Sequence, residues 1–285
     1  MKKTFSLLIV LALSAALAGC GANGKNEGNN EQAASGNKAE AANAPKAEVK
    51  KIIVGTGTGF KKVCFLDENG KLTGFDVELV RKIDEELPEY EFEFKTMDFS
   101  NLLLSLETDK IDFVAHEIEK NPEREQKYLF NQEPYAHWRN KIVVTKENDS
   151  IQSLDDLKGK KVLTTATSAQ AQILENYNKE HENAIEIVYQ NNGANDTVNQ
   201  LVTGRVDATL SADFVLSLID PEGKLKTTGE PLSEADILFT FRKDEPESKE
   251  LADAIDTAIV KLKGDGTLGK LSTEWLGGDF TSESK

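Results

Sequence analysis

The 285-residue chain contains few of the residues that build metal sites and disulfide bonds. Its two cysteines, Cys20 and Cys64, form no CxxC pair, and its three histidines, His116, His137 and His181, lie far apart. A dedicated zinc site is therefore not expected, because zinc is held by nitrogen and sulfur ligands at close spacing. No nucleophile–histidine–aspartate set is visible either. The sequence thus disfavours an enzyme and predicts no catalytic residue, no metal and no cofactor.

Basic residues are also fewer than acidic residues. The chain has 34 Lys and Arg residues against 49 Asp and Glu residues, and no basic stretch is interleaved with aromatics. A field of this sign favours neither nucleic acid nor anionic lipid headgroups, so neither is an expected partner. Hydrophobic residues make up 39% of the chain, which suits a globular protein in water.

Long apolar runs are missing except at the N-terminus. Lys2 and Lys3 precede an apolar run that ends at Leu17, and Leu-Ala-Gly-Cys closes it at positions 17–20. The run is too short to span a bilayer comfortably and has the layout of a signal peptide. Its closing residues resemble the bacterial lipobox, which implies a signal peptide over residues 1–19 and lipidation of Cys20. An ordinary signal peptide with an incidental cysteine is the alternative.

The lipobox resemblance implies a location on the extracytoplasmic face of the bacterial cell membrane. A diacylglyceryl group carries two acyl chains, which anchor a protein stably where one chain does not. Residues 20–49 are rich in Gly, Asn, Ala, Glu and Lys and lack aromatics. Such a segment buries too little apolar area to offset its ordering entropy, so we expect a disordered tether.

Beyond the tether, strand and helix patterns alternate in two series. The first series has strand patterns at 52–55, 91–94 and 111–115, and helix patterns at 75–87 and 100–106, the latter capped by Ser100. The second has strand patterns at 142–145, 161–164, 185–189 and 206–210, and helices that begin at Ser153, Ser168 and Asp196. A strand at 237–241 and helices at 247–262 and around Trp275 follow. The alternation predicts an α/β fold of two lobes, each a mainly parallel sheet flanked by helices.

Five short motifs occur in order along the chain. They are DENGKLTGFDVEL at 67–79, NPER at 121–124, SLDDLKGKKV at 153–162, GRVDA at 204–208, and LKGDGT at 262–267 followed by WLG at 275–277. At this spacing they resemble the polar amino-acid binding proteins of bacterial ABC importers, over residues 51–277. The loop AHEIEKNPER is longer than the commonest family version and resembles the cystine-binding branch.

The family resemblance implies a type II periplasmic-binding-protein fold with a ligand cleft between two lobes. Lobe 1 would comprise residues 50–136 and 236–285, and lobe 2 residues 141–231. Two hinge strands would join them near 136–140 and 230–234, and the lobes would close over the ligand. The expected partners are an amino-acid ligand and a membrane permease, and the protein is expected to be a monomer.

Arg124 is the expected partner of the ligand carboxylate. The resemblance assigns this role to the arginine of NPER, and a guanidinium can grip two oxygens at once. The turn Thr167-Ser168-Ala169 is a second candidate, because it opens a helix and such ends attract anions. This turn lacks the glycines that are usual in the family.

Phe60 and Phe99 are the expected contacts of the ligand side chain, since both lie in loops where the family carries pocket aromatics. The partner of the ligand ammonium stays open between two residues. The family places an aspartate where this chain has Ala212, so Asp213 would serve only if the loop shifts by one residue. Glu117, in the lengthened loop, is the alternative.

Two other functions remain open at this point. A secreted enzyme similar to cyclohexadienyl dehydratase could use the same two-lobed fold, because fold alone does not set function. A ligand-sensing module is the second alternative. The sequence leaves open which amino acid is bound.

Overall fold

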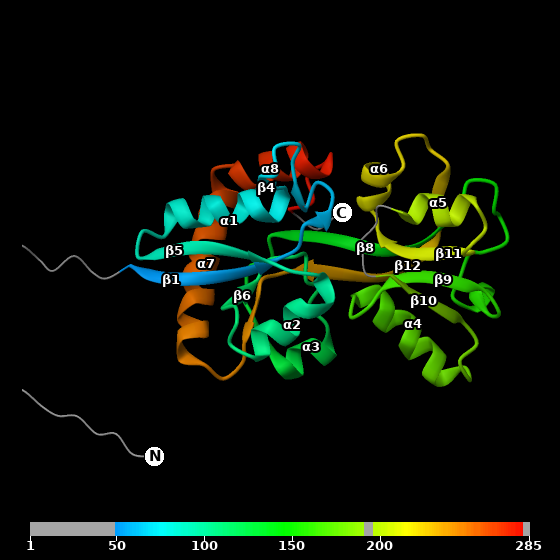
Figure 1. Cartoon of the computed structure of the whole chain (residues 1–285), viewed down its shortest axis with the longest axis horizontal. Helices are drawn as coiled ribbons and strands as arrows, with labels where there is room; N and C mark the ends of the chain where they lie inside the picture. The colour runs from blue at the N-terminus through cyan, green and yellow to red at the C-terminus, as the bar shows by residue number, and fades with distance from the viewer. Residues whose placement is uncertain (1–48, 191–195, 282–285) are drawn as a thin grey trace, which may run out of the picture. The chain divides into compact units, whose positions relative to one another are not determined.

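The computed structural model describes residues 49–190 and 196–281 (Figure 1). The expected signal peptide and nearly all of the expected tether lie outside these residues. In the described ranges, no helix combines the length and the apolar character needed to cross a membrane. These described residues form one compact unit, which contains both lobes of the expected α/β fold.

The first lobe is built on a five-stranded sheet with the order β5-β1-β6-β13-β7. The bounds of these strands are β5 (Tyr90–Thr96), β1 (Lys50–Thr56), β6 (Phe113–Val114), β13 (Thr240–Arg242) and β7 (Tyr128–Phe130). Its helices are α1 (Phe75–Glu86), α2 (Phe99–Glu107), α3 (Pro122–Lys127), α7 (Pro246–Gly264) and α8 (Thr267–Leu276). A small antiparallel sheet adds β2 (Gly59–Phe60), β3 (Cys64–Leu66) and β4 (Leu72–Thr73).

The second lobe is built on a five-stranded sheet with the order β10-β9-β11-β8-β12. The bounds are β10 (Glu186–Gln190), β9 (Lys161–Thr165), β11 (Ala208–Ala212), β8 (Ala136–Thr145) and β12 (Leu225–Ile237). Its helices are the 3-10 turn η1 (Asp155–Leu157), α4 (Ala169–Glu180), α5 (Thr197–Val202) and α6 (Val215–Ile219).

Both sheets are mixed rather than mainly parallel, which corrects the expectation from the sequence. In each sheet two pairings are parallel and two are antiparallel: β13 runs against β6 and β7, and β8 runs against β11 and β12. In the second sheet, β8 and β12 are long strands that run in opposite directions between the lobes (Figure 1). In the first sheet, the antiparallel strand is β13, which follows β12 in the chain. A local alternation of strands and helices does not reveal such a return path.

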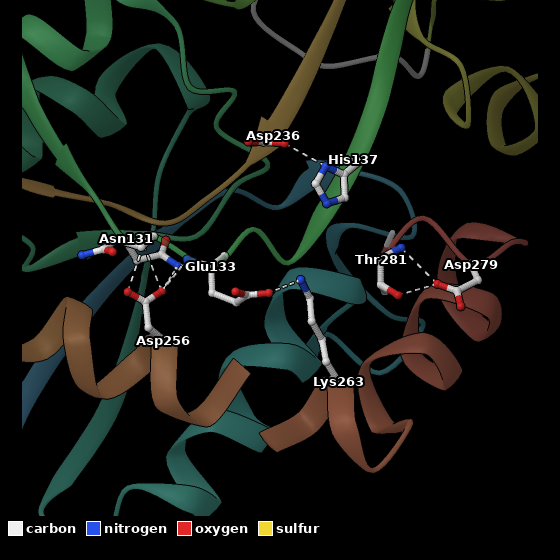
Figure 2. Close-up of polar contacts among 9 residues, drawn as sticks. Asn131, Glu133, His137, Asp236, Asp256, Lys263, Asp279 and Thr281 are labelled. Carbon is white, nitrogen blue, oxygen red and sulfur yellow. Dashed lines mark hydrogen bonds and ion pairs between the residues drawn. The ribbon is translucent and has the colours of Figure 1, made fainter. Parts of the chain in front are cut away.

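The two crossing strands pair closely where the hinge is expected. Ala136 pairs with Ile237 and Asn140 with Ser233, and the register shifts between Thr228 and Ser233. A polar contact of 2.8 Å joins His137 Nδ1 of β8 to Asp236 Oδ1 of β12 (Figure 2). The antiparallel ladder therefore links the two sheets through two adjacent strands.

The segment that precedes β8 is held against helix α7 by hydrogen bonds and an ion pair. The carboxylate of Asp256 in α7 accepts hydrogen bonds of 2.8 Å from Asn131 Nδ2 and from the backbone N–H of Glu133 (Figure 2). Lys263 of the same helix pairs with the Glu133 side chain. These contacts hold the entry of the first crossing strand against a helix of lobe 1.

Local sequence signals explain the helices. α1 buries the apolar face that includes Val77, Leu79, Val80 and Ile83. α4 begins as predicted, since the Ser168 hydroxyl accepts a hydrogen bond of 3.0 Å from the Ala171 N–H. Ser100, in contrast, is not the cap of its helix, because α2 begins one residue earlier and Asp98 holds the capping position. The expected strand at 237–241 is interrupted, since β12 ends at Ile237 and β13 begins at Thr240.

Candidate functional site

A cavity of about 420 Å³ is lined by residues of both lobes. This size lies within the range of small-molecule sites. Lobe 1 contributes Gly57, Thr58, Gly59, Phe60, Met97, Asp98, Phe99, His116, Glu117, Glu119 and Arg124. Lobe 2 and the crossing strand β8 contribute Trp138, Thr164, Thr165, Ser168, Ala169, Gln170, Gln190, Thr197, Thr209, Leu210, Ser211, Ala212, Val215 and Ile219.

Arg124 lies at the junction of the two lobes. Asn121 caps α3 by accepting a hydrogen bond of 2.9 Å from the Arg124 N–H, which fixes the backbone of the arginine. The guanidinium donates from Nη1 to the Glu119 carbonyl (2.7 Å) and from Nη2 to the Thr167 carbonyl of lobe 2 (2.9 Å). Burial lowers the pKa of Arg124, although Glu119 and Tyr128 oppose that shift. A guanidinium keeps its charge under such conditions, so the cavity wall carries a buried cation.

The turn before α4 enters the site only in part. Ser168 and Ala169 line the cavity, so the N-terminal end of this 12-residue helix borders it. Thr167 does not line the cavity. Its backbone is left-handed (φ 64°), and its carbonyl rather than its side chain contacts Arg124. The end of α4 thus offers the cavity a positive helix dipole beside the arginine.

Aromatic side chains form another part of the cavity wall. The ring of His116 lies 4.8 Å from that of Phe99 and 6.1 Å from that of Phe60, measured between centroids. Burial lowers the pKa of His116 to about 4, so its imidazole is neutral at physiological pH. A Cβ at Gly57 would lie 2.7 Å from His116 Nε2, which explains the glycine at this point of the wall. Phe60 and Phe99 therefore line the cavity, although they lie in β2 and at the start of α2 rather than in loops.

Glu117 lines the cavity, whereas Asp213 does not. Pairing of β11 with β8 matches Ala212 with Asn140, which places the next residue beside Arg139. Asp213 donates its backbone N–H to the Arg139 carbonyl (3.0 Å), and its carboxylate lies 3.3 Å from Arg139 Nε. Six of the eight predicted ligand-binding residues thus line one cavity, and Thr167 and Asp213 are the two that do not.

A buried polar network at the same wall was not predicted. The Glu119 carboxylate accepts hydrogen bonds from Asn140 Nδ2 (2.9 and 3.0 Å) and from Gln170 Nε2 (3.1 Å). Gln170 also donates to the Asn140 side chain, and Asn140 donates to Ser233 Oγ (2.9 Å). Burial raises the pKa of Glu119, while the hydrogen bonds from Asn140 oppose that shift. The network ties lobe 1, both crossing strands and α4 of lobe 2 together.

Comparison with known proteins places the chain in a family. Residues 52–278 match the model of the bacterial extracellular solute-binding proteins, family 3. The chain belongs to this family. The fold class and the binding class that the five motifs imply are thereby confirmed, and the chain is an extracytoplasmic binding protein rather than an enzyme.

Individual relatives are similar over nearly their whole length. The chain is 44% identical to the L-cystine-binding protein TcyK of Bacillus subtilis, over 99% of this chain and 98% of the relative. It is 45% identical to the L-cystine-binding protein TcyJ of the same organism, over 85% and 90%. A solved structure of a putative L-cystine ABC transporter from Listeria monocytogenes aligns with a TM-score of 0.78 at 50% identity, covering 83% of this chain and all of that one.

Proposed function

We propose that this protein is the substrate-binding component of an amino-acid ABC importer and that its ligand is L-cystine. The observation that carries the proposal is one cavity with a buried guanidinium, Arg124, and a carboxylate, Glu117, in its wall. An α-amino acid presents the complementary carboxylate and ammonium. The relatives at 44% and 45% identity are named for L-cystine, which supports L-cystine as the ligand.

Each side chain of the cavity has a role in this proposal. Arg124 pairs with one ligand carboxylate, next to the Ser168–Ala169 end of α4. Glu117 holds the ligand ammonium, because it lines the cavity and Asp213 does not. Phe60 and Phe99 flank the disulfide-bearing side chain, since aromatic rings bury apolar area with few rotors to freeze.

The lobes rotate about the crossing strands to admit and release the ligand. In this proposal lobe 1 comprises residues 50–136 and 236–285, and lobe 2 residues 141–231. The hinge lies near 136–140 and 230–234, where β8 and β12 pair between the two sheets. The Glu119–Gln170 hydrogen bond joins residues of opposite lobes, so opening has to break it.

Binding itself is the first test of the proposed function. A thermal-shift screen of the twenty common amino acids, ornithine and L-cystine should give its largest shift with L-cystine. A ligand at one hundred times its dissociation constant stabilises the folded state by about 2.7 kcal/mol, which such a screen detects readily. A larger shift with arginine or another single amino acid would overturn the assignment of L-cystine.

Attachment to the membrane through Cys20 is the second part of the proposal. The motif at positions 17–20 supports it. In cells, Cys20→Ser should move the protein from the membrane fraction to the soluble extracytoplasmic fraction and leave ligand binding by the purified protein unchanged. Retention of the Cys20→Ser protein in the membrane fraction would contradict lipidation. The protein acts as a monomer that delivers its ligand to a membrane permease.

A further inference from the structure

We propose that Asp76 is a positioning residue for Glu117, and that their two carboxyl groups hold one proton that the ligand ammonium displaces on binding. The inference rests on the proposed function, in which Glu117 holds the ammonium. It adds a regulatory property, because the affinity for the ligand then depends on pH.

The backbone geometry of Glu117 shows how Asp76 positions it. Glu117 has a left-handed backbone (φ 47°), a conformation that is costly for a residue with a side chain. Its backbone N–H donates a hydrogen bond of 2.7 Å to Asp76 Oδ2, which also lies 3.2 Å from the hydroxyl of Tyr135. Asp76 belongs to the first turn of α1 and has no exposed surface. A rigid helix therefore holds the loop in the conformation that brings Glu117 to the cavity.

Both carboxyl groups have an oxygen without a donor. Asp76 Oδ1 and Glu117 Oε1 are buried and have no hydrogen-bond partner among the described residues. A buried carboxylate oxygen with no donor costs free energy, and two negative charges near each other add to that cost. Protonation of one group removes a charge and turns an acceptor into a donor. The pair therefore favours the singly protonated state.

The neighbours of the pair in the described part of the chain are neutral or acidic. Cys64 in β3 and Tyr135 before β8 both face Asp76, and burial raises the pKa of each, so both are uncharged at neutral pH. His116 in the same loop is also neutral, since burial lowers its pKa to about 4. Glu119 adds another acidic group to the same loop.

Arg124 is the cation of this part of the wall, but its guanidinium donates to the carbonyls of Glu119 and Thr167. Burial raises the pKa of Asp76 to about 7. Burial also raises the pKa of Glu117 well above its usual value, and the charges of Asp76 and Glu119 add to that effect. Both shifts favour retention of the proton near neutral pH.

The consequence for binding follows from the charges. An ammonium group at Glu117 supplies the missing positive charge and favours the ionised carboxylate, so the proton leaves when the ligand binds. Release of one proton per ligand raises the affinity by up to about tenfold per pH unit, for as long as the empty protein still holds the proton. The affinity for L-cystine should therefore rise from pH 5.5 and level off at alkaline pH.

Calorimetry with L-cystine tests this directly. At pH 6.0 the apparent binding enthalpy of the wild-type protein should vary linearly with the ionisation enthalpy of the buffer, with a slope that corresponds to release of about 0.5 to 1 proton, as expected for a single site of this kind. At pH 8.5 the slope should be close to zero. A slope of zero together with tight binding at pH 6.0 would overturn the inference and leave the proposed function intact.

The variant Asp76→Asn distinguishes two roles of Asp76, which are to hold the proton and to accept the hydrogen bond from the Glu117 N–H. The amide oxygen of the substituted side chain can still accept from the Glu117 N–H, but the neighbouring charge is gone. The ratio of the affinities at pH 8.5 and pH 5.5 should fall by a factor of about ten relative to wild type, the equivalent of one pH unit of titration. A merely structural role for Asp76 would weaken binding equally at every pH. The control is Glu85→Gln, which removes an exposed carboxylate of the same helix and should leave the ratio unchanged.

Failure of L-cystine to bind would overturn the proposed function. In that event, a measurement without ligand still tests whether Asp76 and Glu117 hold a proton. A carboxyl whose pKa is higher in the folded than in the unfolded state makes the fold less stable as pH rises between the two values. The melting temperature of the wild type should therefore fall relative to that of Asp76→Asn between pH 5 and pH 8. If the melting temperatures of the two proteins changed with pH in parallel, the inference that the two carboxyl groups hold one proton would be wrong.

Discussion

The two walls of the cleft differ in the kind of polar group that they present. Lobe 1 supplies ionisable side chains, among them Asp98, Glu117, Glu119 and Arg124, together with the aromatic rings. Lobe 2 supplies neutral hydroxyl and amide groups and the end of α4. A ligand charge left without its partner in a closed cleft costs more than one lost neutral hydrogen bond. Substitutions in lobe 1 should therefore reduce affinity much more than substitutions in lobe 2.

The largest loss is expected for Arg124→Ala in lobe 1. Truncating a buried charge pair costs about 2–5 kcal/mol, which corresponds to roughly 30-fold to several thousand-fold in the dissociation constant. Arg124→Lys should recover only part of the affinity, because an ammonium cannot grip two oxygens in a fixed plane. Titration calorimetry with L-cystine measures both. Near-normal affinity of Arg124→Ala would show that the ligand carboxylate binds elsewhere.

A loss of about tenfold or more, about 1.4 kcal/mol, is expected for Glu117→Gln at pH 8. The glutamine keeps the shape of the side chain and removes the charge that faces the ammonium. Asp213→Asn is the matched control, since Asp213 pairs with Arg139 outside the cavity and its substitution should change the affinity by less than about twofold. If Asp213→Asn weakened binding more than Glu117→Gln, the assignment of the ammonium partner would have to be reversed.

The smallest effect on affinity is expected in lobe 2, for Ser168→Ala. The substitution removes the hydroxyl that caps α4, which should lower the free energy of unfolding by about 1 kcal/mol. The affinity should fall only a few-fold, because the helix end and its dipole remain. Ser153→Ala, which removes an exposed hydroxyl contact with Asp156 in the same lobe, should leave affinity unchanged. A loss for Ser168→Ala as large as that for Arg124→Ala would contradict the comparison of the two walls.

Local patterns predicted the parts of the fold that depend on neighbouring residues. The apolar face of α1, the Ser168 cap of α4 and the long helix α7 all follow from residues within a few turns of one another. The family motif NPER in addition predicted that Arg124 lies in the cleft. Each of these features could be predicted because its partners are close in the sequence.

Features that depend on distant pairings could not be predicted in the same way. Asn140 of β8 pairs with Ser233 of β12 and with Ala212 of β11. The pairing with Ala212 places the next residue, Asp213, beside Arg139, and this register cannot be read from the sequence. The Glu119–Gln170 contact joins residues that are 51 positions apart. Thr167 has a left-handed backbone, and its carbonyl rather than its side chain contacts Arg124. No glycine in the sequence indicates this turn. Sequence spacing alone does not determine these positions.

The burial of Cys64 has a consequence for the proposed cargo. The thiol has no exposed surface, and its Sγ lies behind Gly57, 3.5 Å from where a Cβ on that residue would be. Burial raises its pKa, so the nucleophilic thiolate is scarce at neutral pH. A thiolate in the cleft wall would attack the disulfide of cystine and leave half of the ligand covalently attached to its carrier. In the proposed function, burial keeps Cys64 from that exchange, so that the ligand leaves the protein unchanged and the protein can be used again.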